Sequence, residues 1–116
     1  MSQQYDLEER TFQFAKKVAL FIKGLTKDIA NLEYAKQVVR SSGSVGANYI
    51  EANESLSKKD FVMRVKICRK EAKESQYWLR LILETNNLKT ETEALVLMRE
   101  AEELKKILSA ILLKSQ

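Results

Sequence analysis

The sequence predicts an all-α protein that folds as an up-down-up-down antiparallel four-helix bundle and occupies residues 1–116 as a single domain. Three observations predict this fold class. The 116-residue chain has no proline and three glycines, too few turn residues for a sandwich or a barrel. Its 45% hydrophobic and 31% charged residues fit a folded helical domain. Apolar residues recur at spacings of three and four in four long segments, whose short connections place sequential helices antiparallel.

The first helix is expected over residues 7–25. Asp6 can cap its N-terminus, and Glu8 and Glu9 follow in the first turn, where the helix dipole favours negative charge. Its apolar face has the helical spacing of Phe14, Val18, Phe21, Ile22 and Leu25. Residues 26–28 then predict a break in the helix.

The second helix is expected over residues 32–54, with Asn31 as a candidate cap and an apolar face made of Leu32, Ala35, Val38, Val39, Val45, Tyr49 and Ile50. Its middle, residues 40–46, is rich in serine and glycine, so local propensity alone favours a loop there. The apolar period nevertheless resumes in phase beyond this segment. We therefore predict one continuous helix, whose small residues let a neighbouring helix come close and whose hydroxyls bond within the helix or across that crossing.

The third and fourth helices each follow a capping sequence. A capping box at residues 57–60 precedes a helix expected over residues 58–85, and Asn86-Asn87 can end it because asparagine tolerates the left-handed conformation. A second capping box at residues 90–93 precedes a helix expected over residues 91–114. Both helices carry an apolar seam. In the third helix the seam has the average spacing of about 3.5 residues that is typical of bundles, and it consists of Phe61, Val65, Cys68, Ala72, Ser75, Leu79 and Ile82. In the fourth helix it consists of Leu97, Ala101, Leu104, Leu108 and Ile111.

Apolar residues outside the seam of the third helix indicate self-association. A helix packed only inside a small monomer needs an apolar stripe little more than about 100° wide. These residues can belong to a generous core with a partly exposed rim, or they can form an interface with another copy of the chain. We favour the interface, because several large residues lie outside the seam together: Val62, Met63, Ile67, Tyr77, Trp78, Leu81 and Leu83.

The composition argues against an enzyme. The chain has no histidine, so it lacks the usual general base and the commonest metal ligand. The one cysteine, Cys68, lies on a seam, which predicts a buried structural thiol. Carboxylate pairs can hold a hard cation such as Mg²⁺, but di-metal sites in bundles normally add histidine. We predict no catalytic residue, cofactor or metal, and we expect salt bridges to Lys and Arg from Glu51, Glu54, Glu71 and Glu74.

No targeting segment is evident at the N-terminus, which is polar and acidic. The longest apolar runs are far shorter than the roughly 20 residues that cross a bilayer. We therefore expect a cytoplasmic protein.

The charge pattern indicates nucleic acid as a partner. The net charge is +4, and residues 56–80 hold eight Lys or Arg against three acids. A stripe of one sign about 30 Å long along the third helix can track phosphates, although an ordinary solvated face is the alternative. At about 100° per residue, one flank of this helix carries Lys59, Lys66, Lys70, Lys73 and Arg80. We predict these five as nucleic-acid-binding residues, with Arg69, Lys36 and Arg40 as second choices.

The segment RSSGSVGANYIEA, residues 40–52, resembles the hallmark of the 23S rRNA-intervening sequence proteins, a family of four-helix bundles. That hallmark reads R-S-S-x-S-[IV]-x-A-N-[IY]-x-E-[AG]. Residues 14–21 are similar to the F-A-x-x-V-x-x-F pattern of the family's first helix, and residues 57–61 and 70–79 resemble its third helix. The similarity covers about residues 12–88. Thr26 departs from the pattern, since many members have a proline there.

The resemblance implies a protein without enzymatic activity that assembles as a homopentamer. Some members of the family are encoded within insertions in large-subunit rRNA genes. A similar bundle is the accessory protein of diversity-generating retroelements, where a basic pentamer engages nucleic acid and a reverse transcriptase. We therefore expect a homo-oligomer that binds structured RNA or another nucleic acid through basic faces arrayed around a ring. The alternative is a protein-interaction adaptor whose ring touches no nucleic acid.

Overall fold

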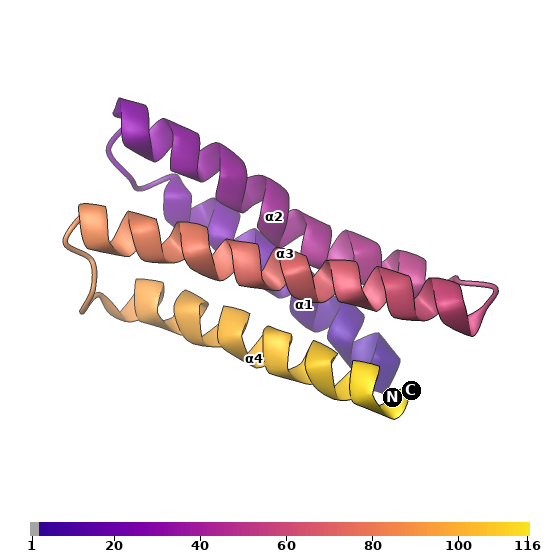
Figure 1. Ribbon diagram of the computed structural model, residues 1–116. Helices are drawn as coiled ribbons and strands as arrows, with labels where there is room; N and C mark the ends of the chain where they lie inside the picture. Colours follow the sequence, from indigo (N-terminus) through magenta and orange to yellow (C-terminus); the bar gives the residue numbers. More distant parts are fainter. Residues whose placement is uncertain (1–2) are drawn as a thin grey trace.

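The computed structural model describes residues 3–116, with side chains described from Asp6 onward. The chain forms four helices: α1 (Gln3–Ile22), α2 (Ile29–Asn53), α3 (Lys58–Thr85) and α4 (Thr92–Lys114). They pack side by side as an elongated bundle that measures 44 by 23 by 21 Å (Figure 1). No strand occurs within residues 3–116, and no helix in that range has an apolar stretch long enough to cross a membrane.

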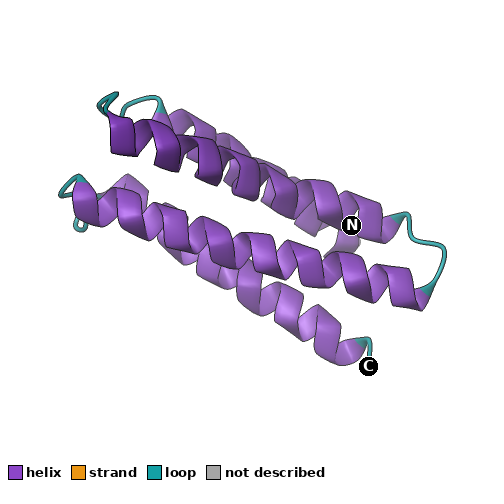
Figure 2. Ribbon diagram, turned by 45° about the horizontal axis from the view of Figure 1, so that its top comes forward, coloured by secondary structure: helices purple, strands orange, loops and turns teal. Residues whose placement is uncertain are grey.

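Each helix runs antiparallel to the helix that follows it (Figure 2). The end of α2 lies beside the start of α1, where Asn53 donates a hydrogen bond to Glu8 over 2.8 Å. The start of α2 lies beside the end of α3, where Asn31 and Asn86 are hydrogen-bonded. Both α1 and α3 pack against α2 and α4, which closes the bundle. The predicted up-down-up-down fold is confirmed, and the start of α1 and the end of α4 lie at the same end of it.

The boundaries of α3 agree with the prediction. The Oγ of Ser57 accepts a hydrogen bond from the amide of Asp60 over 3.1 Å, which satisfies one of the free N–H groups of the first turn. At the other end, the backbone of Asn87 is left-handed, with φ of 58°. Asparagine adopts this conformation more readily than most residues, so the chain can turn here toward α4.

The boundaries predicted for α1 are wrong at both ends. The helix covers Gln3–Ile22 instead of residues 7–25. Asp6 lies inside it and therefore does not cap it, although its charge is in the first turn, where the helix dipole still favours it. The helix ends before Gly24, because glycine weakens a helix and here takes part in a turn.

The caps predicted for α2 and α4 are also wrong. Asp28 caps α2 in place of Asn31, because its carboxylate accepts a hydrogen bond from the Asn31 amide over 2.8 Å. The helix therefore begins at Ile29, earlier than predicted. Glu91 caps α4 in place of Thr90, and its carboxylate accepts a hydrogen bond from the backbone amide three residues later over 2.8 Å.

The serine- and glycine-rich middle of α2 is helical throughout, as predicted. Gly46 lies so close to α1 that a Cβ at this position would be 2.9 Å from the Oγ1 of Thr11. Ser41 faces α3, where its Oγ lies 2.8 Å from the Oγ of Ser75. Two close helix contacts therefore hold a segment that local propensity disfavours, and larger side chains would prevent both contacts.

The core runs the length of the bundle and takes side chains from all four helices. The seams predicted for α3 and α4 are largely confirmed, since they bury Val65, Cys68, Ala72, Leu79, Leu97, Ala101, Leu104 and Leu108. The prediction for α2 is wrong at Leu32, Val39 and Ile50, which are 50%, 44% and 50% exposed. The face of α2 that meets the core is narrower than its apolar stripe, so these three side chains remain on the surface.

Candidate nucleic-acid interface

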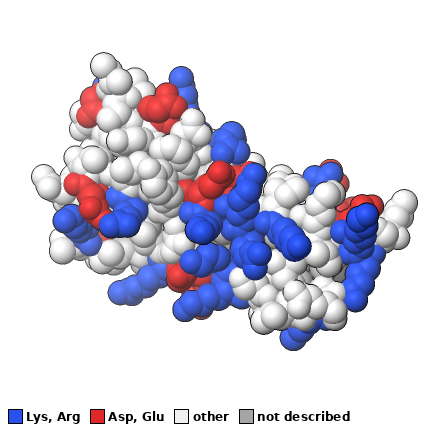
Figure 3. All heavy atoms as spheres, in the orientation of Figure 1, with Lys and Arg blue, Asp and Glu red and all other residues white. Residues whose placement is uncertain are grey.

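The candidate interface is the outer face of α3. The inner face of this helix packs into the core, so residues on the opposite side point to solvent. Four exposed lysines repeat along this outer face, and we call them the lysine stripe: Lys59, Lys66, Lys70 and Lys73. They span about 21 Å at 1.5 Å per residue. Figure 3 shows Lys and Arg side chains gathered over α3 and α4 on this side of the molecule.

The lysine stripe is free of ion pairs among the described residues, although the charge of Lys70 acts on the neighbouring Glu71 carboxylate and opposes the rise in pKa that burial causes there. Within residues 6–116, no ion pair shorter than 4.0 Å involves any of its four ammonium groups. Arg80 lies on the same face, but its Nε is 2.9 Å from the Oε2 of Glu84. The hydrogen bond between them raises the pKa of Arg80 and lowers the pKa of Glu84. The positive field is therefore concentrated between Lys59 and Lys73, because an adjacent acid offsets the charge of Arg80.

The three second-choice residues do not extend the stripe. Arg40 lies on α2, and its guanidinium is 3.5 Å from the carboxylates of both Glu71 and Glu74. Lys36 is exposed on α2, on the same helix face as Leu32. Arg69 is half-buried on the side of α3 that faces α4, where its Nη1 lies 3.5 Å from a serine Oγ. Arg69 is the one of the three that stays close to the stripe.

The serine-rich hallmark segment braces α2 against α3. The hydroxyl of Ser75 bonds both Ser41 and the carbonyl oxygen of Glu71, over 2.8 and 2.9 Å. About two turns further along α2, Arg64 donates to the Oδ1 of Asn48 over 3.1 Å. These contacts join the two helices and satisfy buried polar groups, which is a structural role.

Glu71 is the buried carboxylate of this bracing network. Its residue is 7% exposed, and its Oε1 has no hydrogen-bond partner among the described residues. Burial raises the pKa of Glu71, and a hydrogen bond with Glu74 raises it further, while Arg40 opposes the shift. The predicted salt bridges are confirmed for Glu71 and Glu74.

The salt bridges predicted for the other carboxylate pair are wrong. Glu51 and Glu54 are exposed, and neither forms an ion pair within residues 6–116. No three acidic or cysteine side chains converge in that part of the chain. Cys68 is fully buried, as predicted, and burial raises the pKa of its thiol to about 12.

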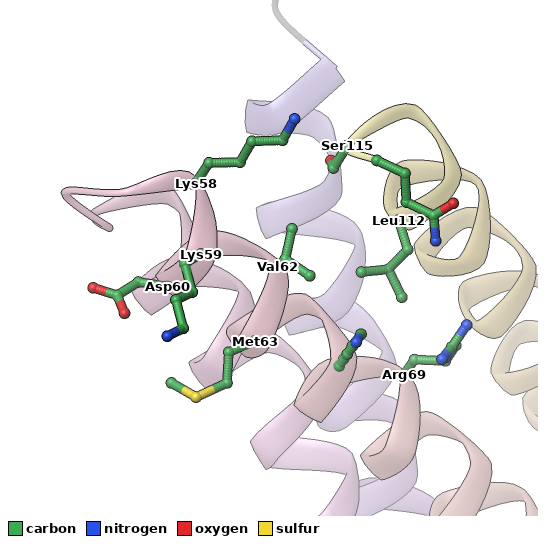
Figure 4. Close-up of a pocket in the computed structure, with 10 residues that line it drawn as sticks. Lys58, Lys59, Asp60, Val62, Met63, Arg69, Leu112 and Ser115 are labelled. Atoms are coloured by element: carbon green, nitrogen blue, oxygen red, sulfur yellow. The ribbon is translucent and has the colours of Figure 1, made fainter.

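A groove lies between the start of α3 and the end of α4, with a volume of about 700 Å³. We call it the α3–α4 groove (Figure 4). Its apolar lining comes from Val62, Met63 and Leu112, and its basic lining comes from Lys58, Lys59, Lys66 and Arg69. The amino-acid sequence alone does not indicate this groove. Helical periodicity predicts which residues of one helix share a face. The groove also depends on how α3 and α4 are aligned along each other, and the sequence of a single helix does not determine this alignment.

Exposed apolar side chains are concentrated on α1 and α2 rather than on α3. Phe12 and Leu20 on α1 are 60% and 54% exposed, and they add to the exposed residues of α2. On α3, three of the residues outside the seam, Val62, Trp78 and Leu83, pack into or against the core, and the Trp78 ring lies tilted against Tyr34 at 6.2 Å between ring centroids. Of all the residues outside that seam, only Met63 and Tyr77 are largely exposed among the described residues.

The fold and this site define a small all-α bundle protein with a cationic outer helix. The family model of the 23S rRNA-intervening sequence protein matches residues 3–110, and the chain belongs to this family. It is also similar to the crystal structure of a protein of unknown function from the S23 ribosomal protein family of Bacteroides thetaiotaomicron. The two are 28% identical with a TM-score of 0.79, over 90% of this chain and 96% of the other. None of the curated proteins compared with the chain matches it.

Proposed function

We propose that this protein is a non-enzymatic, homo-oligomeric bundle that binds structured RNA through its lysine stripe. The observation that carries the proposal is the set of four exposed lysines without ion pairs on one rigid helix face. Their span of about 21 Å matches several successive phosphates of a nucleic-acid strand. Because side chains on a helix surface reach phosphates without entering a deep groove, we expect low sequence selectivity.

Self-association is the second part of the proposal. Leu32, Val39 and Ile50 lie along one outer face of α2, with the exposed Gly43 between them, and Phe12 is exposed on α1. Side chains of this size lose water-exposed apolar surface when a second copy covers them. Together with the family resemblance, this supports a ring of subunits, a pentamer on the family's pattern, which would repeat the lysine stripe around its circumference and strengthen its field.

Charge reversal tests the role of the stripe. The triple variant Lys66→Glu, Lys70→Glu and Lys73→Glu lowers the net charge from +4 to −2. A matched control carries the same change at exposed lysines of α1 and the following turn: Lys16, Lys23 and Lys27. We expect the stripe variant to lose binding of an RNA hairpin at moderate salt, whereas the control keeps most of it. Equal losses of RNA affinity in the two variants would mean that only the net charge matters, which would contradict a role for the stripe itself.

The same preparation separates RNA binding from the adaptor alternative. We expect untagged wild-type protein to co-purify with RNA at low salt, as measured by its absorbance ratio, and the stripe variant to lack that RNA. An adaptor would purify free of nucleic acid in both forms. Sedimentation at micromolar concentration tests the assembly, since a single 13.4 kDa species would contradict a ring.

A further inference from the structure

The α3–α4 groove has the size and the two-part lining of a ligand site. Its volume of about 700 Å³ lies within the range of roughly 300–1,000 Å³ that small-molecule sites occupy. Val62 on α3 and Leu112 on α4 approach each other across its floor (Figure 4). Met63 lies beside them with half of its surface exposed. A ligand that fills this recess must therefore present an apolar surface.

Positive charge surrounds that apolar floor. Lys58, Lys59, Lys66 and Arg69 all line the groove, against one acidic residue, Asp60. Figure 4 shows the Lys58 side chain extending toward Ser115 on α4, so the basic lining reaches across the opening. Neither Lys59 nor Lys66 is in an ion pair within the described residues. The groove therefore favours a ligand that joins an apolar body to an anionic group.

A nucleotide has this combination, because a flat base is attached to a phosphate. In a double helix the bases are stacked inside and only the backbone reaches a protein surface of this shape. A base that is bulged or looped out can leave the stack and enter an apolar recess. Lys59 and Lys66 also belong to the lysine stripe, so an RNA strand on the stripe passes directly over the groove.

We propose that the α3–α4 groove binds an unpaired nucleotide of the RNA that the lysine stripe holds. The base packs on Val62, Met63 and Leu112, and Lys59 and Lys66 contact the adjoining phosphates. This inference rests on the proposed function, since the stripe supplies the strand. It adds a preference for RNA with bulges or loops, which phosphate contacts alone do not provide.

Two RNA hairpins test the inference, one fully paired in its stem and one identical except for a single bulged uridine. We expect the wild type to bind the bulged hairpin about ten-fold tighter, which corresponds to burying one apolar group. The variant Ser115→Trp fills the groove and should bind both hairpins with the affinity of the paired one. The control Leu113→Trp places the same side chain on the same turn, outside the groove, at a residue that is 70% exposed. It should behave as the wild type does.

The outcomes separate this inference from the proposed function. Equal binding of the two hairpins by the wild type overturns the inference but leaves the stripe intact. Absence of binding to both hairpins overturns the two together. Met63→Gln, at an exposed position, provides a second variant that keeps the fold, and an unchanged bulge preference in both groove variants also overturns the inference. Binding of a helical peptide rich in glutamate and leucine that Ser115→Trp abolishes, without any bulge preference, would assign the groove to a protein partner instead.

Discussion

Asn31 at the start of α2 and Asn86 at the end of α3 bind each other through both of their side-chain amides. The Nδ2 of Asn31 donates to the Oδ1 of Asn86 over 2.9 Å, and the reverse bond measures 2.8 Å. The same Nδ2 of Asn31 donates to the carbonyl oxygen of Thr26, also over 2.9 Å. Asn31 is buried, so this pair fastens the turn between α1 and α2 to the end of α3.

Removing one member of the amide pair should destabilise the bundle. We expect Asn31→Ala to lower the free energy of unfolding by about 2 kcal/mol, because it removes the bonds to Asn86 and Thr26 and leaves the Oδ1 of the half-buried Asn86 without its partner. The double variant with Asn86→Ala should lose clearly less unfolding free energy than the sum of the losses in the two single variants, since no side-chain amide is then left without its partner. Denaturant unfolding of all four proteins measures this coupling, and strictly additive losses would contradict it.

Two glycines on α2 should respond in opposite directions to the same substitution. Gly46→Ala places a Cβ 2.9 Å from the Oγ1 of Thr11, so we expect a loss of about 1–3 kcal/mol from overpacking. Gly43→Ala meets no atom within 4 Å and should gain up to about 1 kcal/mol from helix propensity. Thermal unfolding of the two variants tests the difference. A stable Gly46→Ala protein would mean that α1 can move away at little cost.

Glu71 should make the protein less stable as the pH rises through the acidic range. Burial raises its pKa above the usual 4.5, so between that value and the folded pKa the unfolded chain releases a proton that the folded chain keeps. This contribution therefore opposes folding at neutral pH and disappears below pH 4.5. We expect Glu71→Gln to gain stability relative to the wild type as pH increases from about 4 to 7. A difference in unfolding free energy that stays constant across this range would contradict the prediction.

Cys68 should be unreactive in the folded protein. Its side chain is fully buried, and its thiol has a pKa of about 12, so almost no thiolate is present at pH 8. We expect a disulfide reagent to label one thiol per chain in denaturant and essentially none under native conditions. Rapid native labelling would show that α3 separates from the core more readily than its burial indicates.

The affinity for RNA should depend strongly on salt. If each lysine of the stripe neutralises one phosphate, the logarithm of the binding constant should fall with the logarithm of salt concentration with a slope of about −3 to −4. Between 50 and 200 mM salt this amounts to a loss of roughly hundred-fold. A binding titration at several salt concentrations gives the slope. An affinity that does not change with salt would exclude the electrostatic mechanism.

The parts of the fold that local chemistry encodes could be predicted from the sequence. Ser57 accepts its hydrogen bond from the amide of Asp60, three residues later, so a few neighbouring residues determine where α3 begins. The cap of α2 could not be located in the same way. Asparagine is a common capping residue, but the side chain of Asn31 is hydrogen-bonded to Asn86, a residue 55 positions away. Asp28 is then the cap, through a local bond from the amide of Asn31, and aspartate is also a preferred capping residue.

The candidate site also has a part that the sequence predicts and a part that depends on the tertiary fold. The four lysines of the stripe share a face of one helix, so helical periodicity alone places them together. Arg40 could not be assigned from its own helix, because the two glutamates that pair with it lie on α3. The groove likewise combines Val62 with Leu112, whose proximity depends on how two antiparallel helices are aligned.

The order of packing in the bundle also determines how fast it can form. Within residues 3–116, each helix packs against its neighbour in sequence, and only the contact between α1 and α4 joins the first helix to the last. Local contacts of this kind cost little loop-closure entropy, so helical bundles fold within microseconds to milliseconds. In the proposed ring, each subunit would therefore be folded before it meets a second copy. The rate at which the proposed ring assembles would then be set by how often folded subunits meet, and therefore by protein concentration, rather than by folding.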